Sequence, residues 1–191
     1  MTKYILHGGF TSIENKLNRT FYAECTNGSE NNATVLCVYF AREEEDIPRL
    51  FKEDQQKILE TTRAASLNVI LAIEGGFMEQ LKLADVIYIR GGDTEKLLKV
   101  LRQFPRFADG LKNKVVVGSS AGAYILAECY HSATRGGVYK GLGILPIRVI
   151  CHYQSEIYPS IDDPIVAINN GCERSSELVV LKDFEWKVIV V

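Results

Sequence analysis

The sequence predicts an α/β protein built around a mostly parallel β-sheet. Short apolar runs alternate with amphipathic segments, as in strands joined by right-handed helical crossovers. The runs are continuously apolar, such as Thr34–Phe40, which is expected of parallel strands covered on both faces. In Lys114–Ala123, three valines lead into a turn of small residues and then into helix-forming residues. We expect residues 1–191 to form a single domain.

The first part of the chain contains five expected strands, each defined by an apolar run that ends at polar or glycine residues. They are Lys3–His7, Thr34–Phe40, Asn68–Ile73, Ala84–Arg90 and Lys114–Gly118. Helical periodicity or a capping residue predicts a helix between each pair of strands. These helices are Asn15–Cys25, Ile47–Ser66, Phe77–Leu83 and a segment that Asp93-Thr94 caps and that runs to about Gln103.

The pattern changes after the helix that begins near Ala123 and extends to Glu128. We expect loops at Arg135–Gly143 and Pro159–Pro164, where glycine, proline and polar residues gather. The remaining apolar runs are short, and they predict strands that add to the sheet near the end of the chain. These strands are Ile147–His152, Ile165–Ile168, Glu177–Leu181 and Trp186–Val191.

The composition is that of an ordinary globular protein. Hydrophobic residues make up 47% and charged residues 24% of the chain, and the formal net charge is −2. No basic run indicates nucleic acid or an anionic membrane surface, and no apolar run approaches the length of a bilayer span. The chain enters its first strand without an apolar signal segment. We therefore expect a cytoplasmic protein that binds neither nucleic acid nor membranes.

The cysteines give no sign of a disulfide framework or a zinc site. They are odd in number and widely scattered, and they form no C-x-x-C pair. The five cysteines are Cys25, Cys37, Cys129, Cys151 and Cys172. We expect them to be reduced.

The segment Gly118–Gly122 fits G-x-S-x-G between a predicted strand and a predicted helix. A sharp strand-to-helix turn through small residues is a nucleophile elbow, which exposes the central serine at the mouth of a cleft. Ser120 is therefore the candidate nucleophile, and the backbone N–H of Ala121 is a candidate oxyanion donor. The alternatives are a plain tight turn or a cradle for a phosphate or cofactor.

A serine nucleophile needs a base, and the chain has three histidines. His152 and His7 each end an expected strand, and His131 follows the elbow helix. Spacing does not choose among the three, although His152 is favoured. Glu128 is the only carboxylate between Ser120 and His152, whereas α/β-hydrolases place their acid there.

An ordinary esterase or lipase is therefore not expected, and the group that orients His152 should follow it in the chain. The candidates are Asp162, Asp163, Asn170, Glu173 and Glu177.

The glycine pair Gly91-Gly92 ends the strand that precedes the elbow strand. The two turns should be neighbours at the carboxyl edge of the sheet. A free N–H at Gly92 is a candidate for the second oxyanion donor, because glycine lets the backbone approach a substrate closely. A simple strand-to-helix turn is the alternative.

Two motifs together resemble a known peptidase family. Ile87–Thr94, with Gly-Gly-Asp-Thr, and Val117–Ala123, with Ser-Ala-Gly-Ala, are similar to the motifs of the S51 family that contains peptidase E and cyanophycinase. Gly141–Pro146 followed by His152-Tyr153 resembles the stretch that leads to the family's catalytic histidine.

The resemblance implies a three-layer, flavodoxin-like α/β sandwich of the class I glutamine-amidotransferase type, with serine where amidotransferases place cysteine. It implies Ser120 as nucleophile, His152 as base, and Gly92 and Ala121 as oxyanion donors. The family's third catalytic residue is usually a glutamate followed by glycine. Asn170 stands at the best-aligned position, and Glu173 lies close by in the chain.

Three further residues are candidates for substrate binding. Arg90 beside the glycine pair and Arg135 in the loop Ser132–Lys140 could pair with a substrate carboxylate, and Asp93 follows the glycines directly. Either arginine could equally be a solvent-facing charge. The loop is shorter than expected in peptidase E, so selectivity for aspartyl dipeptides is not expected.

These observations predict a serine hydrolase that cleaves amide bonds of small peptides or peptide-like substrates. We expect it to require neither a metal nor an organic cofactor. A second copy of the chain is a further candidate partner. The rival interpretations are a non-catalytic module that binds a small ligand on the same fold, and an amidotransferase-like amide hydrolase.

Overall fold

A computed structural model describes residues 1–160, 162–173 and 175–191. Its central sheet has six strands in the order β10-β1-β5-β4-β2-β3, of which only the edge strand β10 is antiparallel to its neighbour. The strands are β1 (Lys3–His7), β2 (Ala33–Val38), β3 (Leu67–Leu71), β4 (Val86–Ile89), β5 (Val115–Ser119) and β10 (Trp186–Val190). The fold is the expected three-layer α/β sandwich.

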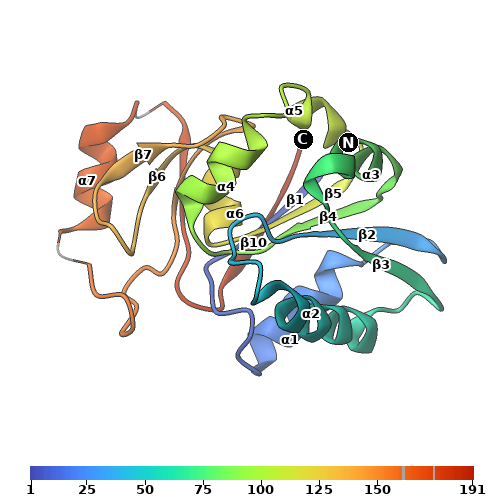
Figure 1. The fold of residues 1–191 in the computed structure, drawn as a ribbon. Coiled ribbons are helices and arrows are strands. Elements are labelled where there is room, and N and C mark those ends of the chain that lie inside the picture. Colours follow the sequence, from blue (N-terminus) through green and yellow to red (C-terminus); the bar gives the residue numbers. More distant parts are fainter. Residues whose placement is uncertain (161, 174) are drawn as a thin grey trace.

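Helices cover both faces of this sheet (Figure 1). They are α1 (Lys16–Cys25), α2 (Ile47–Thr61), α3 (Phe77–Leu83), α4 (Thr94–Leu101), α5 (Phe107–Gly110) and α6 (Ala121–Leu126), with a short 3-10 turn η1 (Glu74–Gly76) before α3. Helices α1 and α2 lie on one face, and α3 to α6 lie on the other.

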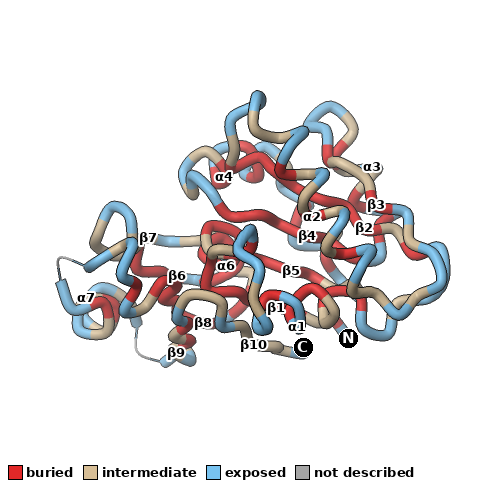
Figure 2. Tube along the Cα trace, turned by 90° about the horizontal axis from the view of Figure 1, so that it is seen from below, coloured by how far each residue is buried: buried red, intermediate tan, exposed pale blue. Residues whose placement is uncertain are grey.

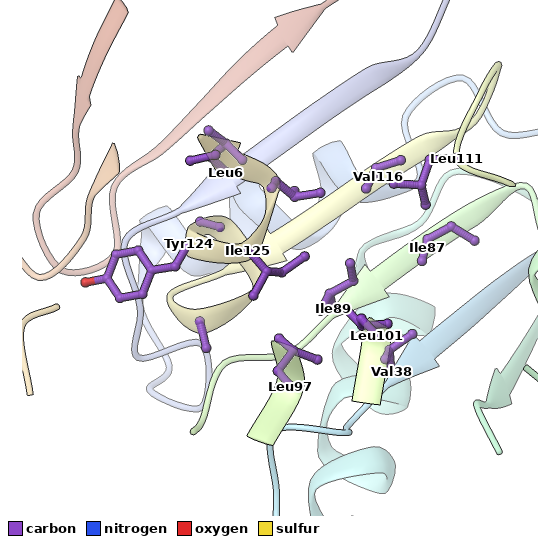
Figure 3. Packing of buried hydrophobic residues seen from close by; sticks show 14 of the residues in the cluster. Leu6, Val38, Ile87, Ile89, Leu97, Leu101, Leu111, Val116, Tyr124 and Ile125 are labelled. Carbon is purple, nitrogen blue, oxygen red and sulfur yellow. The ribbon is translucent and has the colours of Figure 1, made fainter. Parts of the chain in front are cut away.

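The alternation of side chains along each strand divides the core between the two faces. In β4, for example, Ile87 and Ile89 pack on the side of α3 to α6, whereas Tyr88 packs on the side of α1 and α2. Figure 3 shows the cluster on the side of α3 to α6, in which Leu97 of α4 and Ile125 of α6 lie on the same side of the sheet as Ile89 of β4. Strands β1, β4 and β5 are buried almost throughout (Figure 2), which explains their continuous apolar sequences.

Two of the helix starts are capped by side chains, and the cap at Asp93 was predicted. The side chain of Asn15 accepts a hydrogen bond from the backbone N–H of Asn18 at the start of α1. The Oδ1 atom of Asp93 accepts from the backbone N–H groups of Glu95 (2.8 Å) and Lys96 (3.0 Å) at the start of α4.

A second sheet, which the sequence analysis did not predict as separate, lies beside the carboxyl edge of the first (Figure 1). Its order is β7-β6-β8-β9, and helix α7 packs against three of these strands. The elements are β6 (Ala127–His131), β7 (Val138–Lys140), β8 (Leu145–Ile150), α7 (Pro164–Gly171) and β9 (Glu177–Val180).

Several local predictions in this half were wrong. The apolar run Ile165–Ile168 forms part of α7 and not a strand, because Asp163 caps a helix that begins at Pro164. Glu128 lies in β6 and not in the elbow helix, and β7 occupies part of the expected loop Arg135–Gly143.

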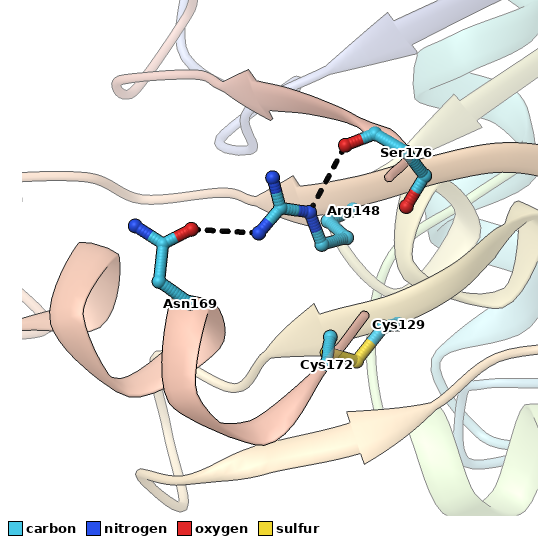
Figure 4. Close-up of a disulfide and its surroundings, with 5 residues drawn as sticks. All are labelled: Cys129, Arg148, Asn169, Cys172 and Ser176. Carbon is cyan, nitrogen blue, oxygen red and sulfur yellow. Dashed lines mark hydrogen bonds between the residues drawn. A yellow bond between two sulfur atoms is a disulfide. The ribbon is translucent and has the colours of Figure 1, made fainter. Parts of the chain in front are cut away.

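The expectation of five reduced cysteines is also wrong. Cys129 of β6 and Cys172, which directly follows α7, form a disulfide with a Cα–Cα distance of 6.5 Å (Figure 4). Cys25, Cys37 and Cys151 are free and buried. The expected absence of disulfides can therefore no longer be used to support a cytoplasmic location, which stays a prediction. None of the helices described is both long and apolar enough to cross a bilayer.

Candidate active site

The turn from β5 into α6 has the geometry of a nucleophile elbow. Ser120 adopts φ 49° and ψ −106°, a conformation that non-glycine residues rarely occupy and that concentrates at functional sites. Its flanking glycines are required by close packing: a Cβ on Gly118 would lie 2.5 Å from the carbonyl oxygen of Gly122, and one on Gly122 would lie 2.3 Å from that of Ile89. The small residues of G-x-S-x-G thus allow the chain to turn beneath the serine.

Ser120 lies at the end of a chain of three hydrogen-bonded side chains. Its Oγ is 3.0 Å from His152 Nε2, and His152 Nδ1 is 2.7 Å from Asp183 Oδ1. Because a carboxylate only accepts hydrogen bonds, we assign the imidazole proton to Nδ1, which donates to Asp183. This tautomer leaves the Nε2 lone pair free to accept the serine hydroxyl. The arrangement is that of a serine hydrolase triad.

His152 is held in a largely buried and aromatic environment. Its side chain is 6% exposed, and Phe10 and Tyr158 meet its ring edge-on at centroid distances of 5.0 and 4.9 Å. Burial lowers the pKa of His152, while the hydrogen bond and the negative charge of Asp183 oppose that shift. The imidazole is therefore neutral near pH 7, as a general base must be.

The Gly91-Gly92 turn lies against the elbow, as the order of the strands predicted. A Cβ on Gly91 would be 3.0 Å from Ser120 Cβ, and one on Gly92 would be 2.3 Å from the carbonyl oxygen of Ala41. Among the described residues, none accepts a hydrogen bond from the Gly92 amide. Ala121, whose N–H follows the nucleophile in the chain, is the first residue of α6.

The chain matches the sequence profile of peptidase family S51 over residues 7–178. It belongs to peptidase family S51. It is therefore a serine-type peptidase by family, and the nucleophile elbow described above lies inside the matched segment. A comparison with curated proteins gives no match.

Solved structures show the same fold as this S51 chain. A peptidase from an acI-B1 Actinobacterium superposes with a TM-score of 0.71 at 21% identity, covering 98% of this chain and 83% of the other. A protein described as peptidase E, from Listeria monocytogenes EGD-e, gives a TM-score of 0.69 at 17% identity, covering 99% and 97% of the two chains.

The residue that orients His152 was missed in the sequence of this S51 peptidase. Neither Asn170 nor Glu173 contacts His152 Nδ1, which is bonded to Asp183. Asn170 is exposed at the end of α7, and Glu173 is exposed two residues after that helix. A weak signal for Asp183 was present, because it is the second residue after the predicted strand Glu177–Leu181 and polar residues near strand ends collect at sites in α/β sheets.

The other two histidines have partners of their own. His7 is fully buried, and its Nε2 lies 2.9 Å from Asn18 Oδ1 while its Nδ1 accepts a hydrogen bond from the Gly9 amide. His131 Nε2 lies 3.0 Å from Asp162 Oδ1 in the second sheet. The structure therefore brings His152, and neither of its rivals, to Ser120.

The three predicted substrate-binding residues all line one cleft of about 650 Å³ that also contains Ser120 and His152. However, each of the three charged side chains already interacts with another group of the protein. The Arg90 guanidinium is buried and pairs with the fully buried Asp54, and Arg135 pairs with Glu95. Asp93 caps α4. A role as the principal anchor of a substrate carboxylate is thus not supported for either arginine.

No cluster of three or more metal-binding side chains occurs in the part of the chain that the structure describes.

Proposed function

We propose that this S51 peptidase hydrolyses amide bonds of small peptides or peptide-like substrates through an acyl-enzyme formed on Ser120. The observation that carries the proposal is the continuous chain from Ser120 Oγ through His152 to Asp183, with contacts of 3.0 and 2.7 Å. A serine is a weak nucleophile by itself, and it requires an adjacent base that is held in the correct tautomer.

In the proposed reaction, Ser120 Oγ attacks the amide carbonyl carbon while His152 Nε2 takes the hydroxyl proton. The carbonyl oxygen becomes an oxyanion, which the backbone N–H groups of Gly92 and Ala121 stabilise. His152 then donates its proton to the amide nitrogen as the C–N bond breaks, and the amine leaves. A water molecule, deprotonated by His152, releases the acyl group and regenerates Ser120.

The cleft supports a preference for small substrates. Its volume of about 650 Å³ lies in the range of pockets that enclose small ligands. Its wall on one side is the hairpin of β6 and β7, which contributes Tyr130, Tyr139 and the intervening Arg135. We expect this wall to limit how far a substrate can extend across the cleft.

The decisive experiment compares the wild-type protein with Ser120→Ala. We expect a fluorophosphonate probe to label the wild type at Ser120, and we expect the variant to lose both labelling and at least about 10⁴-fold of the turnover of a small peptide substrate. Circular dichroism should show an unchanged fold. If the wild type is not labelled, or if the variant keeps its turnover, Ser120 is not the nucleophile, and a ligand-binding module on this fold becomes the better interpretation.

A further inference from the structure

We propose that the turn His7-Gly8-Gly9 at the end of β1 positions all three members of the triad, and that His7 is the positioning residue that fixes this turn. The inference rests on the proposed serine hydrolase function. It assigns a role to a buried histidine that takes no part in the proton transfers.

The turn holds the nucleophile through the backbone. The N–H of Ser120 donates to the carbonyl oxygen of His7 at 2.9 Å, and His7 lies opposite Ser119 in the parallel register of β1 and β5. This hydrogen bond restrains Ser120 in its unfavourable backbone conformation. The elbow is therefore anchored to β1 and not only to its own strand.

The same turn holds the base. The N–H of His152 donates to the carbonyl oxygen of Gly8 at 3.2 Å. Gly9 lies directly against the imidazole, because a Cβ built on Gly9 would be 2.0 Å from His152 Cε1. Any side chain at residue 9 would displace the ring from its contact with Ser120.

The loop that carries Asp183 is attached to the turn as well. The N–H of Gly8 donates to the carbonyl oxygen of Glu185 at 2.8 Å, and the N–H of Phe184 donates to that of Gly9 at 3.3 Å. A Cβ on Gly8 would lie 2.0 Å from the carbonyl oxygen of Lys182. The backbone on both sides of Asp183 thus contacts this one turn.

The His7 side chain holds the turn in place. Its Nδ1 accepts from the Gly9 N–H at 3.0 Å, and its Nε2 donates to Asn18 Oδ1 at 2.9 Å. The Asn18 amide in turn donates to the carbonyl oxygens of Phe10 and Ile13, which belong to the loop after the turn. Burial lowers the pKa of His7 to about 4, although the hydrogen bond to Asn18 opposes the shift. His7 Nδ1 therefore carries no proton near pH 7 and can accept the hydrogen bond from the Gly9 N–H.

Two replacements of His7 test whether its hydrogen bond with Gly9 matters for activity, or only the space that its side chain fills. In His7→Asn the amide oxygen can take the place of Nδ1 and accept from Gly9, whereas in His7→Gln the amide nitrogen can take the place of Nε2 and donate to Asn18. We expect His7→Gln to lower kcat by about 10²-fold with KM unchanged, since a displacement of about 1 Å has this effect on a catalytic constellation. We expect His7→Asn to keep most of the wild-type kcat, because its amide oxygen still accepts the hydrogen bond from the Gly9 N–H.

A second pair of variants tests the contact with the base directly. Gly9→Ala introduces a methyl group into the His152 ring at a residue with φ 124°, and Gly28→Ala introduces one at φ 85° where no atom lies within 4 Å. Both variants are destabilised, because alanine is strained at positive φ. Only Gly9→Ala should also lower kcat and the rate of fluorophosphonate labelling. All rates are expressed per folded molecule.

The proposal is overturned if His7→Gln and His7→Asn have equal kcat, or if Gly9→Ala keeps the labelling rate of Gly28→Ala. A Gly9→Ala chain that does not fold leaves the decision to the two His7 variants. Failure of the wild type itself to react with the probe would contradict the proposed function instead, so the two failures are distinguishable.

Discussion

Two histidine–aspartate pairs lie in different regions of the part of the chain that the structure describes, and one of them contacts the candidate nucleophile. His152 Nδ1 lies 2.7 Å from Asp183 Oδ1 beside the central sheet, and His131 Nε2 lies 3.0 Å from Asp162 Oδ1 where β6 of the second sheet ends. Both histidines are buried, but Asp162 is 42% exposed whereas Asp183 is 18% exposed. The larger difference is on the other ring nitrogen. His152 Nε2 lies 3.0 Å from the Ser120 hydroxyl, whereas no serine among the described residues bonds to the His131 ring.

Pairing with a carboxylate is therefore not enough to identify a candidate base, because His131 has such a partner and does not contact Ser120. What distinguishes the region around His152 is backbone strain, since several residues near the triad have positive φ. They are Phe10, Ser120, His152, Gln154 and Phe184. Such conformations persist only where the surrounding structure enforces them. In the second sheet, by contrast, α7 is fixed by side-chain links, namely the Cys129–Cys172 disulfide and the hydrogen bond from Arg148 to Asn169 (Figure 4).

The largest effect that separates the two pairs should come from Asp183→Asn. An amide at residue 183 no longer enforces the Nδ1–H tautomer or stabilises the imidazolium, and we expect kcat to fall by about 10²–10⁴-fold. Asp162→Asn is the matched control, because it makes the same change in the second pair. Steady-state kinetics of both variants would decide the matter.

Asn170→Ala extends this control to the residue that the family resemblance favoured. We expect it to leave kcat unchanged, as we do for Asp162→Asn. A loss of activity in Asp162→Asn that matched the loss in Asp183→Asn would contradict the assignment of the triad.

Cys172→Ser should have an effect of intermediate size, which lowers the stability of the fold and leaves kcat unchanged. Opening a cross-link between residues 43 apart in sequence should lower the free energy of unfolding by about 2–4 kcal/mol, without changing kcat at temperatures where the protein is folded. Urea unfolding, followed with and without a reductant, measures this effect. If reductant leaves the wild-type midpoint unchanged, the disulfide does not contribute to stability in solution.

The smallest effect concerns pH. The base must be neutral to accept the serine proton, and burial lowers the pKa of His152 from its ordinary value of 6.5. Activity should therefore be retained as the pH falls to 6.5 and be lost only below it. The pH profile of kcat/KM reports this value for the free enzyme. An acid limb above pH 6.5 would show that the favourable charge of Asp183 outweighs burial.

The sequence was informative wherever a local pattern dictates local structure. The valine run, the glycines around Ser120 and the Asp93 cap each act within a few residues, so the elbow and the five parallel strands were predictable. His152 was favoured but not decided by spacing, because its approach to Ser120 depends on how the second sheet packs beside the first.

The orienting residue was not predicted, because a position shortly after a predicted strand, which Asp183 shares with Asp93, does not identify the acid that reaches His152. Its role follows from backbone contacts with Gly8 and Gly9, which lie near the other end of the sequence. The helix α7 was likewise mistaken for a strand, since four apolar residues in a row do not separate a short helix from a strand.

The pairing of β1 with β10 affects when the candidate active site of this peptidase can form during translation. The turn after β1 precedes β10 and the loop of Asp183 in the chain, so a ribosome synthesises it long before the loop that it holds. Until that loop has emerged, His152 lacks its orienting carboxylate. If the proposed triad is correct, a nascent chain of this peptidase is expected to remain inert towards neighbouring peptides until β10 has joined the sheet beside β1.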